Sequence, residues 1–196
     1  MVERGYDEPI LMAAASDIGT VRKQNEDYFF FSEKGKFFIV CDGMGGHKSG
    51  ALASKIAGET VRDVLLKNKA IDIGKVCNDI DENLPLPALK LIAGVRLANR
   101  RIALEAQRNE EHRGMGSTIV AALLYEKWLF SINVGDSRIY RLRNSQLSLL
   151  TKDHSWINEL IEDREISEKD VQKFHKKKCP HTRARYLSDC ENRSSN

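Results

Sequence analysis

The sequence predicts an α+β fold in which helices stack on antiparallel sheets. Three observations lead to this prediction. Apolar strands open the chain, two long helical patterns follow, and a run of short strands comes last. The length of 196 residues suits one domain with a sizeable core.

The first strands are expected at residues 10–15, 27–31 and 36–41, around a polar loop. The last of them, KFFIVC, is apolar at almost every position, which predicts a strand buried on both faces. Asp42 follows it directly, with three glycines among the next four residues. We therefore expect a lone carboxylate at the tip of this strand, on flexible backbone.

Two amphipathic helices are expected next. From Ser49 to about Lys67, apolar residues recur at spacings of three and four. The second helix begins near Pro85 or Pro87 and runs to about Arg108, since proline is favoured in the first helical turn.

The strands after these helices read STIVAALLY, KWLFSINV, SRIYRLR and QLSLLT. Their connectors, at residues 126–127, 135–136 and 144–145, are typical of hairpins, so an antiparallel meander is predicted. Two further helical segments are expected at residues 155–163 and 167–174.

The charge pattern separates a mildly acidic body from a basic tail. From Lys173 onward there are seven Lys/Arg and two Asp/Glu, whereas the rest holds 24 basic and 26 acidic residues. An acidic body argues against nucleic-acid binding. No apolar run approaches the ~18 residues of a membrane span, and the first residues lack a signal-peptide core. We therefore expect a cytoplasmic protein without a membrane partner.

Carboxylates occur where predicted strands begin or end. Glu26 and Asp27 open one strand, Asp42 closes the next, and Asp136 follows a third. Clustered carboxylates repel one another unless a cation neutralises them, and Mg²⁺ and Mn²⁺ prefer oxygen ligands. A metal site, with one or two ions, that activates a water and clamps a phosphoryl group is therefore predicted. Arg22 suits the phosphate, because a guanidinium grips two oxygens at once.

Each of these stretches also has a simpler interpretation. The pairs Asp42-Gly43 and Gly135-Asp136 are common in turns, and residues 25–27 also fit a solvated loop. Neither glycine-rich nucleotide-binding motif occurs in the chain.

Five motifs in order carry a resemblance to a known family: SDIGTVRKQNED, VCDGMGGHKSG, GSTIVAALL, INVGDSRIYRLR and LTKDHSWINEL. They span residues 16–160 and resemble the bacterial branch of the metal-dependent protein serine/threonine phosphatases, the PPM or type 2C family. The resemblance implies a four-layer αββα sandwich of two antiparallel sheets with helices outside. It also implies hydrolysis of phosphoserine or phosphothreonine in a phosphoprotein substrate by a metal-activated water.

The resemblance also implies roles for single residues. Asp42 would bridge two Mg²⁺ or Mn²⁺ ions and the Gly43 carbonyl would be a further ligand. Glu26 would hold metal-bound water with Asp27 beside it, and Arg22 would bind the substrate phosphate.

Two more positions follow from the resemblance. Asp136 would contribute to a third, more weakly held ion. Eukaryotic members place a histidine, a proposed general acid, directly after the Asp-Gly pair. Here that position is Met44, so the role is not transferred to His47.

The resemblance implies a family domain that is incomplete at its C-terminus. Residues 1–178 would be the N-terminal portion of the phosphatase domain, and residues 179–196 a disordered tail outside the family pattern. Two late aspartates that complete the family's metal site have no match here. Codons for residues 178–187 can be chosen so that a shifted frame reads Asn-Val-Leu-Thr-Arg-Ala-Leu-Gly-Ile, the family's continuation. This suggests the hypothesis of a one-base frameshift near Lys176–Lys178.

Three functions stay open at this point. The first is an active phosphoprotein phosphatase. The second is a non-catalytic remnant that binds a partner or phosphopeptide through the face of Arg22. The third is a regulatory phosphatase with one dedicated phosphoprotein, and the oligomeric state is open in each case.

Overall fold

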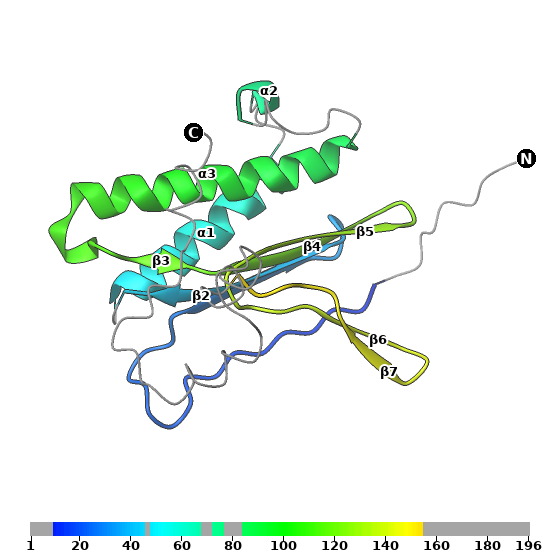
Figure 1. Cartoon of the computed structure of the whole chain (residues 1–196), viewed down its shortest axis with the longest axis horizontal. Helices are drawn as coiled ribbons and strands as arrows, with labels where there is room; N and C mark the ends of the chain where they lie inside the picture. Colours follow the sequence, from blue (N-terminus) through cyan, green and yellow to red (C-terminus); the bar gives the residue numbers. More distant parts are fainter. Residues whose placement is uncertain (1–9, 46–47, 68–71, 77–83, 155–196) are drawn as a thin grey trace, which may run out of the picture.

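The computed structural model describes residues 10–45, 48–67, 72–76 and 84–154, and these residues form an α+β fold, as predicted (Figure 1). One sheet has five strands, and the other has two. The strands of the larger sheet are β1 (Asp27–Ser32), β2 (Phe37–Met44), β3 (Gly116–Ser117), β4 (Ile119–Tyr125) and β5 (Trp128–Val134). They follow the order β1-β2-β4-β5 with β3 paired to β2, and every pairing is antiparallel.

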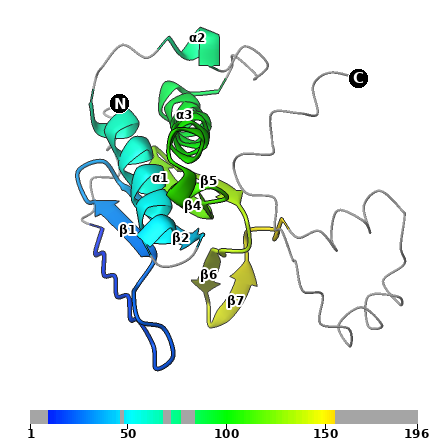
Figure 2. The same ribbon diagram turned by 90° about the vertical axis from the view of Figure 1, so that its left-hand side faces the viewer.

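The smaller sheet pairs β6 (Tyr140–Arg143) with β7 (Gln146–Leu149). It lies on the side of the larger sheet that faces away from the helices (Figure 2). Ile139, just before β6, packs with Val120 and Ala122 of β4. The described residues thus contain one helix layer and two sheet layers of the expected sandwich.

Two long helices cover the other face of the larger sheet (Figures 1 and 2). They are α1 (Lys48–Leu66) and α3 (Leu86–Arg108), which confirms both expected helices, and Pro85 and Pro87 mark the start of α3. Two short elements accompany them, α2 (Ile73–Val76) and the 3₁₀ helix η1 (Glu110–His112). No described helix is both long and apolar enough to cross a membrane.

The main core lies between the helices and the sheet. Its centre is β2, whose side chains alternate between the two faces of the sheet. The buried residues of this core are Phe37, Ile39, Cys41, Ala53, Ala57, Val61, Leu91, Val95, Ala98, Ile102, Met115, Ile119, Ala121, Leu123 and Val134. Small residues on α1 let the helix approach the sheet closely, which removes apolar surface on both elements from water.

The prediction that β2 is buried on both faces is wrong. Phe37, Ile39 and Cys41 face the helices and are at most 2% exposed, whereas Val40 faces the other way and is 42% exposed. The helices cover only one face of the sheet. The composition of a strand does not show whether another layer covers one of its faces or both.

The strand expected at residues 10–15 is not formed. This segment has no strand pairing, and Leu11 is 96% exposed. Residues 10–14 instead line an apolar groove together with Phe29, Phe31 and Val40. The segment therefore borders the sheet across this groove and does not join its backbone ladder.

The expected meander is interrupted. Connectors 126–127 and 144–145 close hairpins, and Asn144 and Ser145 both have positive φ, as a tight primed turn requires. Residues 135–136 do not close a hairpin, because β5 and β6 belong to different sheets. The helices expected at 155–163 and 167–174, and the tail, lie outside the described residues.

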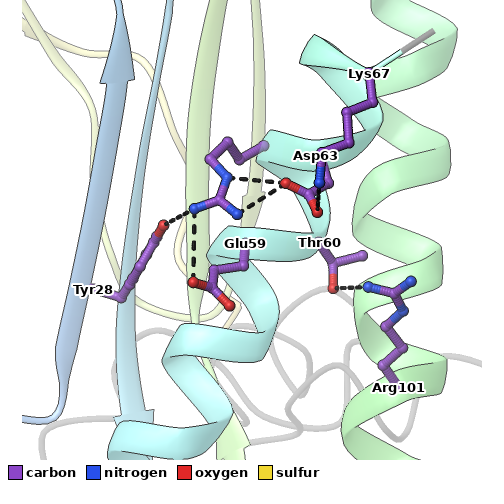
Figure 3. Close-up of polar contacts among 7 residues, drawn as sticks. Tyr28, Glu59, Thr60, Asp63, Lys67 and Arg101 are labelled. Atoms are coloured by element: carbon purple, nitrogen blue, oxygen red, sulfur yellow. Dashed lines mark hydrogen bonds and ion pairs between the residues drawn. The ribbon is translucent and has the colours of Figure 1, made fainter. Parts of the chain in front are cut away.

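Polar contacts tie α1 to its neighbours (Figure 3). The Arg62 guanidinium donates to Asp63 Oδ1 at 2.9 Å and to the Tyr28 hydroxyl of β1 at 3.3 Å. Arg101 of α3 donates to Thr60 Oγ1 at 3.1 Å. These bonds link α1 to the edge strand and to the second helix.

Candidate functional site

The candidate site lies where β1 begins and β2 nears its end. Asp42 of β2 stands opposite Asp27 of β1 in the strand register. The strand continues to Met44, so Asp42 lies within β2 rather than at its tip, contrary to the prediction. The Asp42 N–H donates to Thr118 Oγ1 at 3.0 Å, and the Thr118 N–H donates to the Asp42 carbonyl at 2.8 Å. Both backbone groups of Asp42 are thus bonded to Thr118, while its side chain is exposed to solvent.

The predicted acids act on the carboxyl group of Asp42. Its pKa is raised above the ordinary aspartate value, first by partial burial and then by the negative charge of Asp27. Asp136 and Glu26 raise the pKa further, and Arg22 opposes them. The structure therefore places the other three carboxylates and Arg22 within electrostatic reach of Asp42.

Glu26 lies between β2 and the start of α1. Its carbonyl accepts hydrogen bonds from the Gly43 N–H at 3.1 Å and from Ser54 Oγ at 2.6 Å. Its carboxylate lies against Gly50, where an added Cβ would stand 2.5 Å from Oε2. Gly50 is in the first turn of α1, and the unpaired N–H groups of a helix N-terminus favour a nearby negative charge.

Gly43 marks the closest approach of β2 to α1. A Cβ at this position would stand 2.0 Å from the Gly50 carbonyl oxygen. The sequence suggests that this glycine lets backbone approach an ion, whereas the structure shows that it lets the helix approach the strand. Its role as a carbonyl ligand stays a prediction.

The loop that carries Arg22 is pinned to Asp27. Ser16 Oγ donates to Asp27 Oδ2 at 3.0 Å, and the Asn25 side-chain amide donates to Ser16 Oγ at 2.7 Å. The Asp27 N–H in turn donates to Asn25 Oδ1 at 2.9 Å. Arg22 and Asp27 are both exposed, so a phosphorylated ligand can reach them from solvent.

Asp136 lies in the loop after β5, and the last described segment holds this loop in place. The His154 N–H donates to the Gly135 carbonyl at 2.9 Å. Arg138 makes a two-pronged ion pair with Asp153, with Nε–Oδ1 at 2.8 Å and Nη2–Oδ2 at 2.5 Å. This pair lowers the pKa of Asp153 below its ordinary value.

The sequence analysis did not single out two residues of the site, Thr118 and Ser137. Thr118 bonds the backbone of Asp42, and its hydroxyl also meets the Ser137 hydroxyl at 2.6 Å. The available signal was the pair Ser117-Thr118 directly before a fully apolar strand. Buried hydroxyl groups in such a place need hydrogen-bond partners.

The donor set fits a hard divalent cation. In the described part of the chain, no three carboxylate, imidazole or thiol side chains gather closely enough to enclose a metal ion. The groups around Asp42 are nevertheless oxygen donors, which suits Mg²⁺ or Mn²⁺. The raised pKa of Asp42 reflects partial burial first and neighbouring negative charge second, and a bound cation would offset that charge. His47 lies outside the described residues.

Comparison with known sequences gives a consistent result. The family model described as protein phosphatase 2C matches residues 20–184. The serine/threonine phosphatase stp of Listeria innocua is 36% identical over 165 residues, covering 83% of this chain and 62% of that relative. PstP of Mycobacterium tuberculosis is 32% identical over 159 residues, covering 81% of this chain and 28% of that relative. The chain thus spans less than two thirds of the length of these curated relatives.

Solved structures agree with the sequence comparison. The crystal structure of the Mycobacterium tuberculosis phosphatase PstP/Ppp has a TM-score of 0.66 at 29% identity, covering 90% of this chain and 67% of that one. The PstP catalytic domain in complex with two manganese ions has a TM-score of 0.62 at 31% identity, with coverages of 90% and 66%. With its fold, its ordered motifs and a family match over most of its length, the chain belongs to the protein phosphatase 2C family.

Proposed function

We propose that this chain is a metal-dependent phosphatase that hydrolyses phosphoserine and phosphothreonine in a phosphoprotein. The observation that carries the proposal is the electrostatic influence of three acids, Glu26, Asp27 and Asp136, and of Arg22 on Asp42, which stands opposite Asp27 in the strand register. Family membership supports it, because the relatives are serine/threonine phosphatases. Nothing among these relatives favours the alternative of a non-catalytic remnant.

The cofactor we propose is Mg²⁺ or Mn²⁺, with two ions in the complete site. The PstP catalytic domain binds two manganese ions, which supports this choice. When bound, such a cation acts as a Lewis acid that makes a water more acidic and neutralises phosphoryl charge. Asp42 and the Gly43 carbonyl would hold it, with Glu26 and Asp27 next to them and Asp136 toward a third ion.

The chain's own residues would orient the substrate. Arg22 is exposed, so its guanidinium can bind two oxygens of a phosphoryl group that arrives from solvent. The bonds among Ser16, Asn25 and Asp27 restrain the loop that carries it. A restrained loop places the phosphorus near Asp42 at a smaller entropic cost.

The test is hydrolysis of an aryl phosphate and of a phosphothreonine peptide by the 196-residue chain, with and without Mn²⁺. Turnover that needs Mn²⁺ and disappears in Asp42→Asn supports the proposal. Arg22→Ala should raise KM for the peptide more than it lowers kcat, because Arg22 binds the phosphate before and during reaction. Lys23→Ala is the matched control, since it removes the neighbouring exposed cation, and it should keep wild-type kinetics.

One result would overturn the proposed activity, and another would overturn only the role of Arg22. One is an absence of Mn²⁺-dependent turnover in a folded wild-type chain. If such a chain still binds the phosphopeptide and loses it in Arg22→Ala, the remnant is the better description. The other is equal loss in Arg22→Ala and Lys23→Ala, which would reduce Arg22 to a general contribution to surface charge.

A further inference from the structure

Thr118 contacts Asp42 and both neighbours of Asp136. It is 3% exposed and precedes β4. Its hydroxyl accepts the Asp42 N–H at 3.0 Å, and its own N–H donates to the Asp42 carbonyl at 2.8 Å. Asp42 is therefore tied to Thr118 through both a side-chain and a backbone bond.

The other contacts of Thr118 are with the loop that carries Asp136. Its hydroxyl meets Ser137 Oγ at 2.6 Å. Its methyl group lies under Gly135, where an added Cβ would stand 2.7 Å from Cγ2. Gly135 has a φ of 102°, a conformation that glycine adopts readily. The residues before and after Asp136 thus both rest on one buried side chain.

We propose that Thr118 is a positioning residue that sets the separation between the carboxylates of Asp42 and Asp136. The metal-binding consequence of this inference rests on the proposed function, because it assigns both acids to cations. The contacts themselves exist without a metal. Two carboxylates that repel each other move apart unless rigid structure holds their backbones, and a buried threonine bonded on both sides supplies that restraint.

The hydroxyl and the methyl group of Thr118 can be tested separately. Thr118→Val keeps the shape and removes the hydroxyl, so it cuts the bonds to the Asp42 N–H and to Ser137. Thr118→Ser keeps the hydroxyl and removes the methyl group under Gly135. Ser137→Ala removes only the partner hydroxyl on a half-buried residue, and it serves as the milder variant if Thr118→Val does not fold. Ser131→Ala, an exposed hydroxyl of β5, is the matched control.

The first measurement uses the metal-free chain. Amide hydrogen exchange, followed by NMR, should accelerate at Asp42 and at residues 136–138 in Thr118→Val. Thr118→Ser should restore slow exchange at Asp42. Unchanged exchange at residues 136–138 in both Thr118→Val and Ser137→Ala would overturn the inference, whatever the chain does with metals.

The second measurement is calorimetric titration with Mn²⁺. Substitution of a residue that orients metal ligands typically lowers metal affinity by about 10- to 100-fold, so Thr118→Val should weaken Mn²⁺ binding by this amount. Ser137→Ala should weaken it less, and the double variant no more than Thr118→Val alone, because both changes break one link. Thr118→Ser should recover most of the affinity, and Ser131→Ala should keep all of it.

The two proposals fail in different ways. If the wild type binds Mn²⁺ and Thr118→Val binds it equally well, the positioning role is refuted and the proposed function stands. If exchange responds as expected but the folded wild type neither binds Mn²⁺ nor turns over substrate, the positioning role stands and the proposed function is refuted.

Discussion

A single methyl group at Gly43 should separate α1 from the sheet. Gly43 is buried in β2, and an added Cβ would stand 2.0 Å from the Gly50 carbonyl oxygen and 2.5 Å from its carbon. The Glu26 carbonyl oxygen would be 2.8 Å away on another side. All three atoms belong to backbone, so no side chain can rotate to make room.

The size of the effect follows from these distances. Ordinary contact begins near 3.4 Å, so the first turn of α1 would have to retreat by roughly 1.4 Å in a close-packed core. Overpacking a core typically costs about 1–3 kcal/mol, and a collision with backbone belongs at the upper end. We therefore expect Gly43→Ala to lose about 3 kcal/mol of unfolding free energy, or roughly 6–12 °C in Tm for a chain of this size.

The assay is thermal and urea unfolding of the metal-free chain, beside Gly114→Ala as control. Gly114 has a positive φ, at 78°, which Gly43 does not, and an added Cβ at Gly114 meets nothing within 4 Å. Its substitution should cost only the backbone strain of about 1–2 kcal/mol. If Gly43→Ala melts with the wild type, or above Gly114→Ala, then α1 does not approach β2 as closely as described and the reasoning fails.

Three further predictions concern charge and burial. Because the pKa of Asp42 is raised in the fold, its carboxylate form costs stability, and this cost grows as pH rises through the raised pKa. Metal-free Asp42→Asn should thus melt above the wild type at pH 8, and the gap should narrow as pH falls through the raised pKa toward the ordinary value of 3.8; a gap that stays constant down to that pH would contradict the cause. Burial raises the pKa of the Cys41 thiol far above its ordinary value, so iodoacetamide should modify Cys41 only after unfolding, as peptide mass spectrometry would show. Arg62→Ala should cost about 1 kcal/mol in urea unfolding because it cuts the link from α1 to β1, and Tyr28→Phe should cost less; equal stability of the wild type and both variants would show that the contact between Arg62 and Tyr28 contributes nothing.

The helices were predictable because their signal is local. The apolar spacing predicts residues 49–67, and α1 spans Lys48–Leu66. The same holds for α3, whose start is marked by Pro85 and Pro87. A helix makes its backbone hydrogen bonds within its own segment, so its pattern needs no partner.

The strands were less predictable because a strand is completed by another segment. Residues 10–15 are apolar like β1, yet they do not pair with another strand. Side-chain composition does not show whether a segment finds a partner for its backbone hydrogen bonds. Residues 135–136 look like a hairpin turn, yet they join two sheets. In both cases the deciding contact lies far away along the chain.

The same distinction between local signals and contacts between distant segments applies to the candidate site. The sequence by itself determined the chemistry: several carboxylates, one arginine suited to phosphate, and glycines where backbone must pass closely. Residue types and ordered motifs carry that information. Only the tertiary structure decided that Asp27 stands opposite Asp42, that Gly43 makes room for α1, and that Thr118 joins Asp42 to the loop of Asp136. Strand register and backbone contact distances arise from segments up to 76 residues apart, and no local pattern encodes them.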